Sequence, residues 1–269
     1  MARAAAERFQ RAALGPRLLT AAVGLPALLG ALWAGGLWWI GVTALIGLLG
    51  AREYARIRGL EPRAGAALLG LGSALYALTV SGGRLAVAAV LTVWVAVVVI
   101  ETASRLAAAG QGARVLAGPA AWLLLGPLYL AAPLAVLVRW RLEQPPGSLL
   151  SFFLIVWAND TAAYCVGIVA GRRRLAPRIS PGKSWEGAVA GVAAGALVAA
   201  ALSRWLGLAA APAALFGVAV AVASQLGDLL ESAMKRAAGV KDSGTVLPGH
   251  GGILDRFDGV LLAAPVAYV

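Results

Sequence analysis

The sequence predicts an all-α fold, a polytopic bundle of about nine transmembrane helices with its N-terminus in the cytoplasm. Three observations support this prediction. Of the 269 residues, 61% are hydrophobic and 13% are charged, and the mean hydropathy is +0.83. Because about 25% of the residues of a soluble domain are charged, this composition favours lipid as the surroundings of the chain. The other two observations are a series of long apolar runs and an uneven distribution of Lys and Arg between them.

The apolar runs are long enough, or nearly so, to cross a hydrocarbon core of about 30 Å. They lie near residues 18–34, 37–51, 64–80, 85–100, 115–138, 149–169, 187–207, 210–227 and 258–269. The second run follows Gly35-Gly36, so it either forms a tight hairpin with the first run or is only partly inserted. The ninth run is short for a full crossing, and the number of spans is therefore open by one or two.

The distribution of Lys and Arg predicts the orientation. With the N-terminus inside, 19 of the 23 Lys and Arg fall in segments that face the cytoplasm, and the other four are Arg84, Arg139, Arg141 and Arg204. The cytoplasmic segments are the N-terminus, 51–63, 101–114, 170–186 and 228–257. Cytoplasmic loops of membrane proteins are rich in these residues, so the net charge of +11 reflects topology. Nucleic-acid binding is disfavoured, because no soluble stretch is long enough to form a basic module.

The basic N-terminus resembles a secretory signal, but further spans follow it closely, so we interpret it as a retained first helix. We expect residues 1–148 to form N-terminal transmembrane helices and residues 149–269 to form C-terminal transmembrane helices that carry the site. The two sets form one membrane unit without a soluble domain. The single cysteine, Cys165, excludes an intrachain disulfide, so the fold depends on helix packing. Small residues allow close packing in lipid, and homodimers as well; such residues include Gly47, Gly50, Gly187 and Gly191.

The densest group of charged residues follows the eighth apolar run. It comprises Asp228, Lys235, Arg236, Lys241, Asp242, His250, Asp255 and Asp258. Carboxylates can hold Mg²⁺, and cations orient phosphates. Asp228 begins an amphipathic continuation of the run, in which Glu231 or Ser232 and then Lys235 recur at helical spacing. The glycine-rich run 248–252 would let backbone amides approach a phosphate.

These charges could be the ordinary solvated residues that end every span. Against that alternative, Asp255 and Asp258 lead directly into the final apolar run, where an unpaired carboxylate is costly. The two are three residues apart, so in a helix they share a face. The only histidine, His250, is a proton donor, a phosphate hydrogen-bond donor or a structural turn residue, and we favour the second role.

Two further groups precede this cluster. Asn159 and Asp160 lie inside the sixth apolar run, where they are either functional ligands or a helix-to-helix hydrogen-bonding pair; we favour ligands. The segment 171–187 is basic, and its Gly182-Lys183-Ser184 resembles the end of a P-loop. Pro177 stands where that motif needs a glycine, so we reject the P-loop. We interpret Arg172 to Arg174 as topology anchors, and Ser180, Lys183 and Ser184 as a site for a nucleotide triphosphate or an anionic lipid head group.

The C-terminal part resembles the signature of the phosphatidate cytidylyltransferases, also called CDP-diacylglycerol synthases. The matching residues are Ser232, Lys235-Arg236, Lys241-Asp242, Gly244, Pro248, His250-Gly251-Gly252, Asp255-Arg256 and Asp258. The segments 157–164 and 179–187 also resemble this family, so the similarity begins near residue 150. Two positions differ from the family pattern. Gly259 stands where serine is usual, which removes a hydroxyl near the metal, and Gly182 replaces a common lysine.

The resemblance implies transfer of the cytidylyl (CMP) group from CTP to phosphatidate, with CDP-diacylglycerol and pyrophosphate as products. It implies Mg²⁺, with a monovalent cation such as K⁺ as a second ion. The implied metal ligands are Asp228, Asp255 and Asp258, with Asp255 the first choice. Lys241, Asp242 and His250 complete the catalytic set. The implied substrate-binding residues are Asn159, Asp160, Ser180, Lys183, Ser184, Lys235 and Arg236.

The expected mechanism is in-line attack by a phosphatidate oxygen on the α-phosphorus of CTP. A phosphomonoester has a second pKa of about 6, so the nucleophile is already anionic near neutral pH. We expect an integral protein of a bacterial inner membrane, with its site facing the cytoplasm and CTP, phosphatidate and membrane lipids as partners. Two alternatives are a CTP-dependent polyprenol or phytol kinase and a secondary transporter with cation sites at Asp160 and Asp228.

Overall fold

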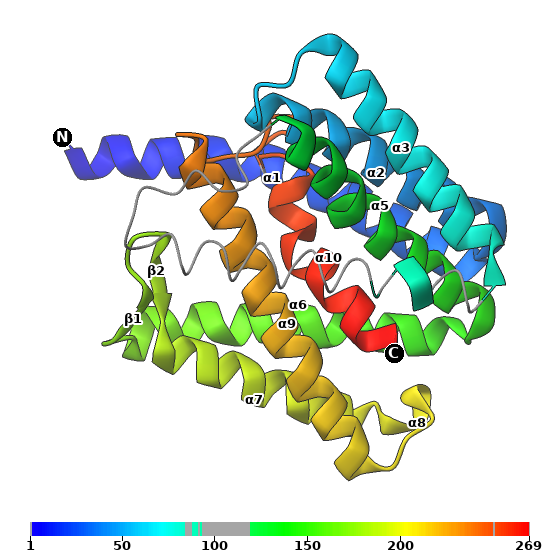
Figure 1. The fold of residues 1–269 in the computed structure, drawn as a ribbon. Coiled ribbons are helices and arrows are strands. Elements are labelled where there is room, and N and C mark those ends of the chain that lie inside the picture. The colour runs from blue at the N-terminus through cyan, green and yellow to red at the C-terminus, as the bar shows by residue number, and fades with distance from the viewer. Residues whose placement is uncertain (1, 84–87, 91, 93–118, 250, 269) are drawn as a thin grey trace, which may run out of the picture.

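A computed structural model of the chain describes residues 2–83, 88–90, 92, 119–249 and 251–268 (Figure 1). Nearly all of the regular structure in these residues is helical. The helices are α1 (Ala2–Ala34), α2 (Gly36–Ile57), α3 (Pro62–Ser81), α5 (Pro119–Glu143), α6 (Pro146–Ala170), α7 (Trp185–Ala201), α8 (Ser203–Leu206), α9 (Ala210–Ala237) and α10 (Leu254–Tyr268). A short antiparallel hairpin joins α6 to α7 and consists of β1 (Arg174–Ala176) and β2 (Ser180–Ser184).

The helical prediction is confirmed for the described residues, and the predicted run 85–100 lies mostly outside them. Two features differ from the expectation, and one agrees with it. Helix α2 continues to Ile57, into the predicted loop 51–63. Helix α9 continues to Ala237, as the amphipathic pattern after residue 227 predicts. The basic segment 170–186 contains two strands, which the all-α prediction did not include.

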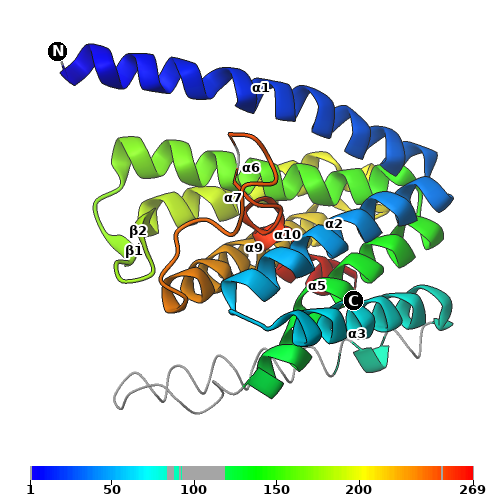
Figure 2. The same ribbon diagram turned by 90° about the horizontal axis from the view of Figure 1, so that it is seen from above.

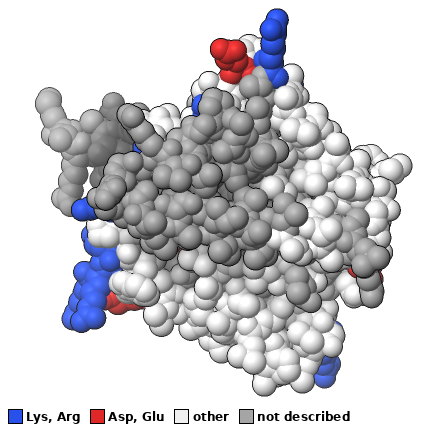
Figure 3. All heavy atoms as spheres, viewed as in Figure 1, with Lys and Arg blue, Asp and Glu red and all other residues white. Residues whose placement is uncertain are grey.

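Two of the described helices, α6 and α9, are long and apolar enough to cross a membrane. Shorter apolar helices span Leu18–Ala34, Gly65–Ser81 and Trp185–Ala201. Large apolar side chains also face outward, among them Leu37, Val169, Leu197 and Leu215. In the view of Figure 3, much of the described surface is uncharged, and Lys and Arg lie at its edges. These features indicate a membrane protein, while nine spans remain a prediction.

Helices α1 and α2 form the tight hairpin that the glycine pair suggested. Gly35 and Gly36 both have positive φ, 66° and 48°, in the turn between them. The last carbonyl groups of a helix lack partners within it, and Arg141 of α5 donates to those of Leu32 (2.7 Å) and Trp33 (3.1 Å). Figure 2 shows α1 along the outside of the bundle, beside α6 and α2.

Small residues permit the close packing of α6, α7 and α9. A Cβ added at Gly191 of α7 would lie 2.6 Å from Oδ1 of Asn159 on α6. A Cβ at Gly217 of α9 would lie 2.6 Å from the Cβ of Ala199 on α7. Neither position has room for a side chain. This agrees with the prediction that small residues such as Gly191 allow these helices to pack closely.

Helix α10 connects the two halves of the chain. It packs against α9 and α6 of the C-terminal half and against α5 and α2 of the N-terminal half (Figure 1). Aromatic contacts also cross between the halves, because the ring of Trp39 on α2 meets that of Phe153 on α6 edge to face at 6.2 Å. The N-terminal helices can therefore contribute side chains to the predicted C-terminal site.

Candidate functional site

Several of the predicted site residues lie where the end of α9, the start of α10 and the β1–β2 hairpin come together. We call Asp228, Glu231, Lys235, Asp255 and Asp258 the α9–α10 charged cluster. The continuation of α9 to Ala237 carries the first three of these residues, and the start of α10 at Leu254 carries the other two.

Lys235 forms the centre of one part of this cluster. Its Nζ lies 2.5 Å from Oε2 of Glu231, one helical turn earlier, and 2.6 Å from Oδ1 of Asp255. Glu231 is only 1% exposed. A buried charge is costly unless it is paired, so the ammonium of Lys235 is needed to compensate two carboxylates and to join α9 to α10.

Asp255 accepts hydrogen bonds from several other donors. The backbone amide of Ser243 donates at 3.0 Å, its hydroxyl at 2.9 Å, and the amide of Gly252 at 2.8 Å. Burial alone would raise the pKa of Asp255, but the hydrogen bonds from Lys235 and Gly252 outweigh burial and hold this pKa below its usual range. Asp255 is therefore a carboxylate at neutral pH.

The glycine-rich segment before α10 fits closely around Asp255. Gly251 has a φ of +84°, a conformation that favours glycine, and a Cβ there would lie 2.7 Å from Oδ2 of Asp255. The amide of Gly252, which the sequence suggested for a phosphate, donates instead to Asp255. His250 lies outside the described residues, and its predicted phosphate contact remains a prediction.

Asp228 links the hairpin to α9. Nζ of Lys183 on β2 lies 2.5 Å from Oδ2 of Asp228, and the hydroxyl of Ser232 donates to Oδ1 at 3.2 Å. Both charged side chains are partly exposed, at 24% for Lys183 and 39% for Asp228. This ion pair is therefore accessible to a phosphate group.

Asp258 lies within electrostatic range of other acidic groups. The carboxylates of Asp228, Glu231 and Asp160 all act on it electrostatically, so α6, α9 and α10 direct negative charge into one region. Among the described residues, no three His, Cys, Asp or Glu side chains are placed as a ready metal site.

Asn159 and Asp160 make different contacts. Asn159 is fully buried and accepts a hydrogen bond from Nε2 of Gln225 on α9 at 2.7 Å. This contact is the helix-to-helix alternative, which the sequence interpretation did not favour. The side-chain Nδ2 of Asn159 also donates to Oδ1 of Asp160 at 3.0 Å. Asp160 lies within electrostatic range of Asp228 and Lys183. Only Asp160 thus joins the acidic region.

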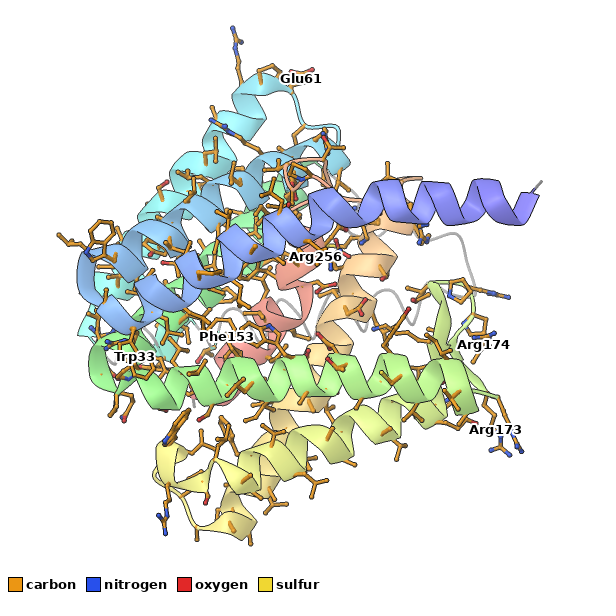
Figure 4. All side chains as sticks on the ribbon, turned by 180° about the vertical axis from the view of Figure 1, so that it is seen from behind. Trp33, Glu61, Phe153, Arg173, Arg174 and Arg256 are labelled. Atoms are coloured by element: carbon orange, nitrogen blue, oxygen red, sulfur yellow. The ribbon has the colours of Figure 1, made fainter. Side chains whose placement is uncertain are left out.

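Ser184 caps the start of α7, and its predicted contact with substrate stays a prediction. Its hydroxyl accepts from the amide of Gly187 at 3.1 Å and caps the helix. Glu186 accepts from the amides of Arg172 and Arg173, and backbone hydrogen bonds lower its pKa. Figure 4 shows Arg173 and Arg174 on the outside of the hairpin, where topology anchors would be expected.

The remaining predicted residues border the cluster. Ser180 starts β2 and pairs with Ala176. Arg236 donates to the carbonyl groups of Ile179 (3.4 Å) and Val240 (2.9 Å), and so connects the hairpin to the segment after α9. Lys241 and Asp242 are exposed on that segment.

The sequence interpretation missed Glu53 on α2, because it placed residues 51–63 in a solvated loop. Glu53 is 3% exposed and accepts hydrogen bonds from the amides of Ile253 and Leu254. The hydroxyl of Ser243 also lies within hydrogen-bonding distance of Glu53. A signal was present in the sequence. Gly47, Gly50 and Tyr54 recur at helical spacing through this region, and Glu53 follows Gly50 by three residues on the same face.

Two hydroxyl groups near Asp258 were also missed. Tyr129 of α5 has a buried hydroxyl without a hydrogen-bond partner in the described part of the chain, within electrostatic range of Asp258, Glu231 and Asp228. The buried hydroxyl of Ser224 on α9 lacks such a partner as well, and it occupies the space into which a side chain at Gly259 would project. Ser224 thus places a hydroxyl group of α9 beside position 259.

Comparison with known proteins identifies the family. A sequence model described as the cytidylyltransferase family matches residues 15–269. A phosphatidate cytidylyltransferase of Pseudomonas aeruginosa is 38% identical over 265 residues, which are 94% of this chain and 95% of the relative. Its namesake from Brucella suis is 41% identical over 153 residues, 55% of this chain. That alignment spans 56% of the Brucella protein. With its family match over nearly the whole length, the chain belongs to the cytidylyltransferase family.

Proposed function

We propose that this protein transfers the cytidylyl group of CTP to phosphatidate and produces CDP-diacylglycerol and pyrophosphate. The names of its relatives support this reaction. The observation that carries the proposal is the α9–α10 charged cluster, in which Lys235 lies against carboxylates and Asp228 pairs with Lys183 of β2, at one end of an apolar bundle. Such a site can receive a water-soluble nucleotide and a lipid phosphate together.

In the proposed reaction, an oxygen of the phosphatidate phosphate forms a bond to the α-phosphorus of CTP. The bond from that phosphorus to the bridging oxygen breaks, and the electron pair leaves with pyrophosphate. Because the second pKa of a phosphomonoester is about 6, the attacking oxygen needs no strong general base. Catalysis then depends on positioning and on compensation of negative charge, which is what a cluster of Lys, Arg and Asp can provide.

The cations have distinct proposed roles. Lys183 is partly exposed in its pair with Asp228, so it can exchange that partner for a CTP phosphate. Lys235 is held between Glu231 and Asp255, so its ammonium is fixed in place before substrate arrives. Arg236 and Lys241 are exposed at the rim, where they would attract the triphosphate. We keep Asp242 and His250 as predicted contributors to phosphate orientation.

The acidic groups fit Mg²⁺ in donor type, because carboxylate oxygens are the hard ligands that this ion prefers. Asp228 and Asp258 act on one another electrostatically across α9 and α10, so we propose them as the principal ligands, with Asp160 beside them. The oxygens of Asp255 already accept from Lys235, Ser243 and Gly252, which favours a supporting role over the direct ligation that the sequence suggested. A bound divalent ion would neutralise phosphate oxygens. A monovalent second ion remains part of the proposal.

We further propose that the site faces the cytoplasm of a bacterial inner membrane. The excess of Lys and Arg in the segments that carry the site supports this orientation. CTP would enter from water, and phosphatidate would enter sideways from the lipid between helices. A homodimer through faces of small residues is compatible with the packing.

The position of the isotope in CTP tests the reaction. Purified protein in detergent is given phosphatidate, Mg²⁺ and CTP labelled either at the α-phosphate or at the γ-phosphate. Cytidylyl transfer places only the α-label in lipid. Transfer of the γ-label would instead identify a CTP-dependent lipid kinase, and the absence of both labels from lipid would leave transport assays as the next step.

A further inference from the structure

Glu53 places a carboxylate from the N-terminal half against the start of α10. Its Oε1 accepts from the backbone amide of Ile253 at 2.9 Å, and its Oε2 accepts from that of Leu254 at 3.0 Å. The first amides of a helix have no acceptor within the helix, and a negative charge is favourable at that end. Glu53 therefore acts as an N-terminal cap for α10 from a helix about 200 residues earlier in the chain.

The surrounding chain fits closely around this carboxylate. A Cβ added at Gly244 or at Gly252 would overlap the side chain of Glu53. Arg56, one turn further along α2, donates to the carbonyl of Ser243 at 2.6 Å. The last turns of α2 thus hold both ends of the segment 243–254, which leads into the α9–α10 charged cluster.

Ser243 connects Glu53 to Asp255. Its hydroxyl oxygen lies 2.9 Å from Oε2 of Glu53 and 2.9 Å from Oδ2 of Asp255. A hydroxyl has one proton and donates to one acceptor at a time, so the two carboxylates share this donor. The successive amides from Gly252 to Leu254 are divided in the same way, the first to Asp255 and the next two to Glu53.

We infer that Glu53 is a positioning residue for the reaction: through Ser243 and the start of α10 it fixes Asp255, and with it the ammonium of Lys235. The kinetic part of this inference rests on the proposed function. The positioning role of Glu53 gives the N-terminal half an influence on the chemistry. Every site residue predicted from the sequence, in contrast, lies at residue 159 or later.

The test first compares three purified variants with wild type, and then adds Ser243→Ala alone and combined with Glu53→Gln. Glu53→Gln keeps the shape but replaces one acceptor oxygen with an NH₂ donor that faces N–H and O–H groups. Glu53→Asp keeps the carboxylate and shortens the side chain. Glu61→Gln is the matched control, because Glu61 is exposed between α2 and α3 and points away from the bundle (Figure 4). Each variant is checked for monodispersity and thermal unfolding in detergent, and rates are expressed per CTP-binding site.

We expect Glu53→Gln to lower kcat roughly 10- to 100-fold, the range for a small misplacement of a reacting group, while KM for phosphatidate stays within about twofold. Glu53→Asp recovers part of the rate. If Glu53 acts through Ser243, adding Ser243→Ala to Glu53→Gln lowers kcat little further, because the effects of substitutions within one hydrogen-bond network are not additive. The inference is overturned if the kcat of Glu53→Gln matches that of the Glu61→Gln control. It is also overturned if the fold-losses in kcat caused by Glu53→Gln and by Ser243→Ala multiply in the double variant.

Hydrogen–deuterium exchange provides a readout that does not depend on activity. In Glu53→Gln, the amides of residues 252–254 should exchange faster than in the control, and unchanged exchange would exclude the positioning role. One outcome is that wild type makes no CDP-diacylglycerol while the amides of residues 252–254 still exchange faster in Glu53→Gln than in the control. In that case the proposed function has failed, but the structural link between Glu53 and Asp255 stands.

Discussion

Replacement of Lys235 by methionine should destabilise the protein far more than its single charge suggests. Lys235 pairs with Glu231 and Asp255, and the side chains of these partners are only 1% and 9% exposed. Methionine has a similar length but no charge, so the buried side chains of Glu231 and Asp255 would lose their cationic partner. Removal of one partner from a buried pair costs about 3–5 kcal/mol, and we expect a loss in that range.

The assay is reversible unfolding in mixed detergent micelles, with Lys241→Met as the matched control. Lys241 is exposed, and exposed charges contribute about 0–1 kcal/mol. Addition of Glu231→Gln to Lys235→Met should recover part of the loss, because it removes one of the uncompensated charges. The reasoning is refuted if Lys235→Met unfolds like the control, or if the second substitution destabilises the protein further.

Three other predictions concern packing and pH. Gly259→Ser should impair folding because its Cβ would overlap the hydroxyl of Ser224, and Ser224→Ala should restore it in a double-mutant cycle of thermal unfolding. Gly191→Leu should separate α7 from Asn159 on α6, where no space exists, with a cost of about 1–3 kcal/mol from overpacking, measured by the same unfolding assay. The lowered pKa of Asp255 predicts a stabilisation that is present above its unfolded pKa of about 3.9 and is lost as pH falls through the folded pKa. Unfolding measured from pH 6 to pH 3 should show this loss, and the loss should be smaller in Asp255→Asn.

The local features of the site could be predicted from the sequence. The spacing of Asp228, Glu231 and Lys235 predicted the helical continuation of α9, and the structure confirms it. Gly35-Gly36 predicted a sharp turn, and that turn is present. These predictions succeed because helical periodicity and glycine conformation depend on neighbouring residues.

Long-range partners could not be predicted in the same way. Asn159 meets Gln225 across a helix interface, and Glu53 meets the start of α10, because tertiary packing brings together segments that no local pattern connects. Ser184 illustrates another limit. A hydroxyl at the entry to a helix serves equally well as a cap or as a phosphate ligand in a sequence pattern, and only the contact with Gly187 reveals the cap.

The most direct test of the account counts products. Wild type and Asp255→Asn are incubated with phosphatidate, α-labelled CTP and Mg²⁺, and labelled lipid and pyrophosphate are measured together. We expect wild type to release one pyrophosphate for each CDP-diacylglycerol formed, and the folded Asp255→Asn variant to form little of either product. Labelled lipid without pyrophosphate, or equal rates in both proteins, would contradict the account.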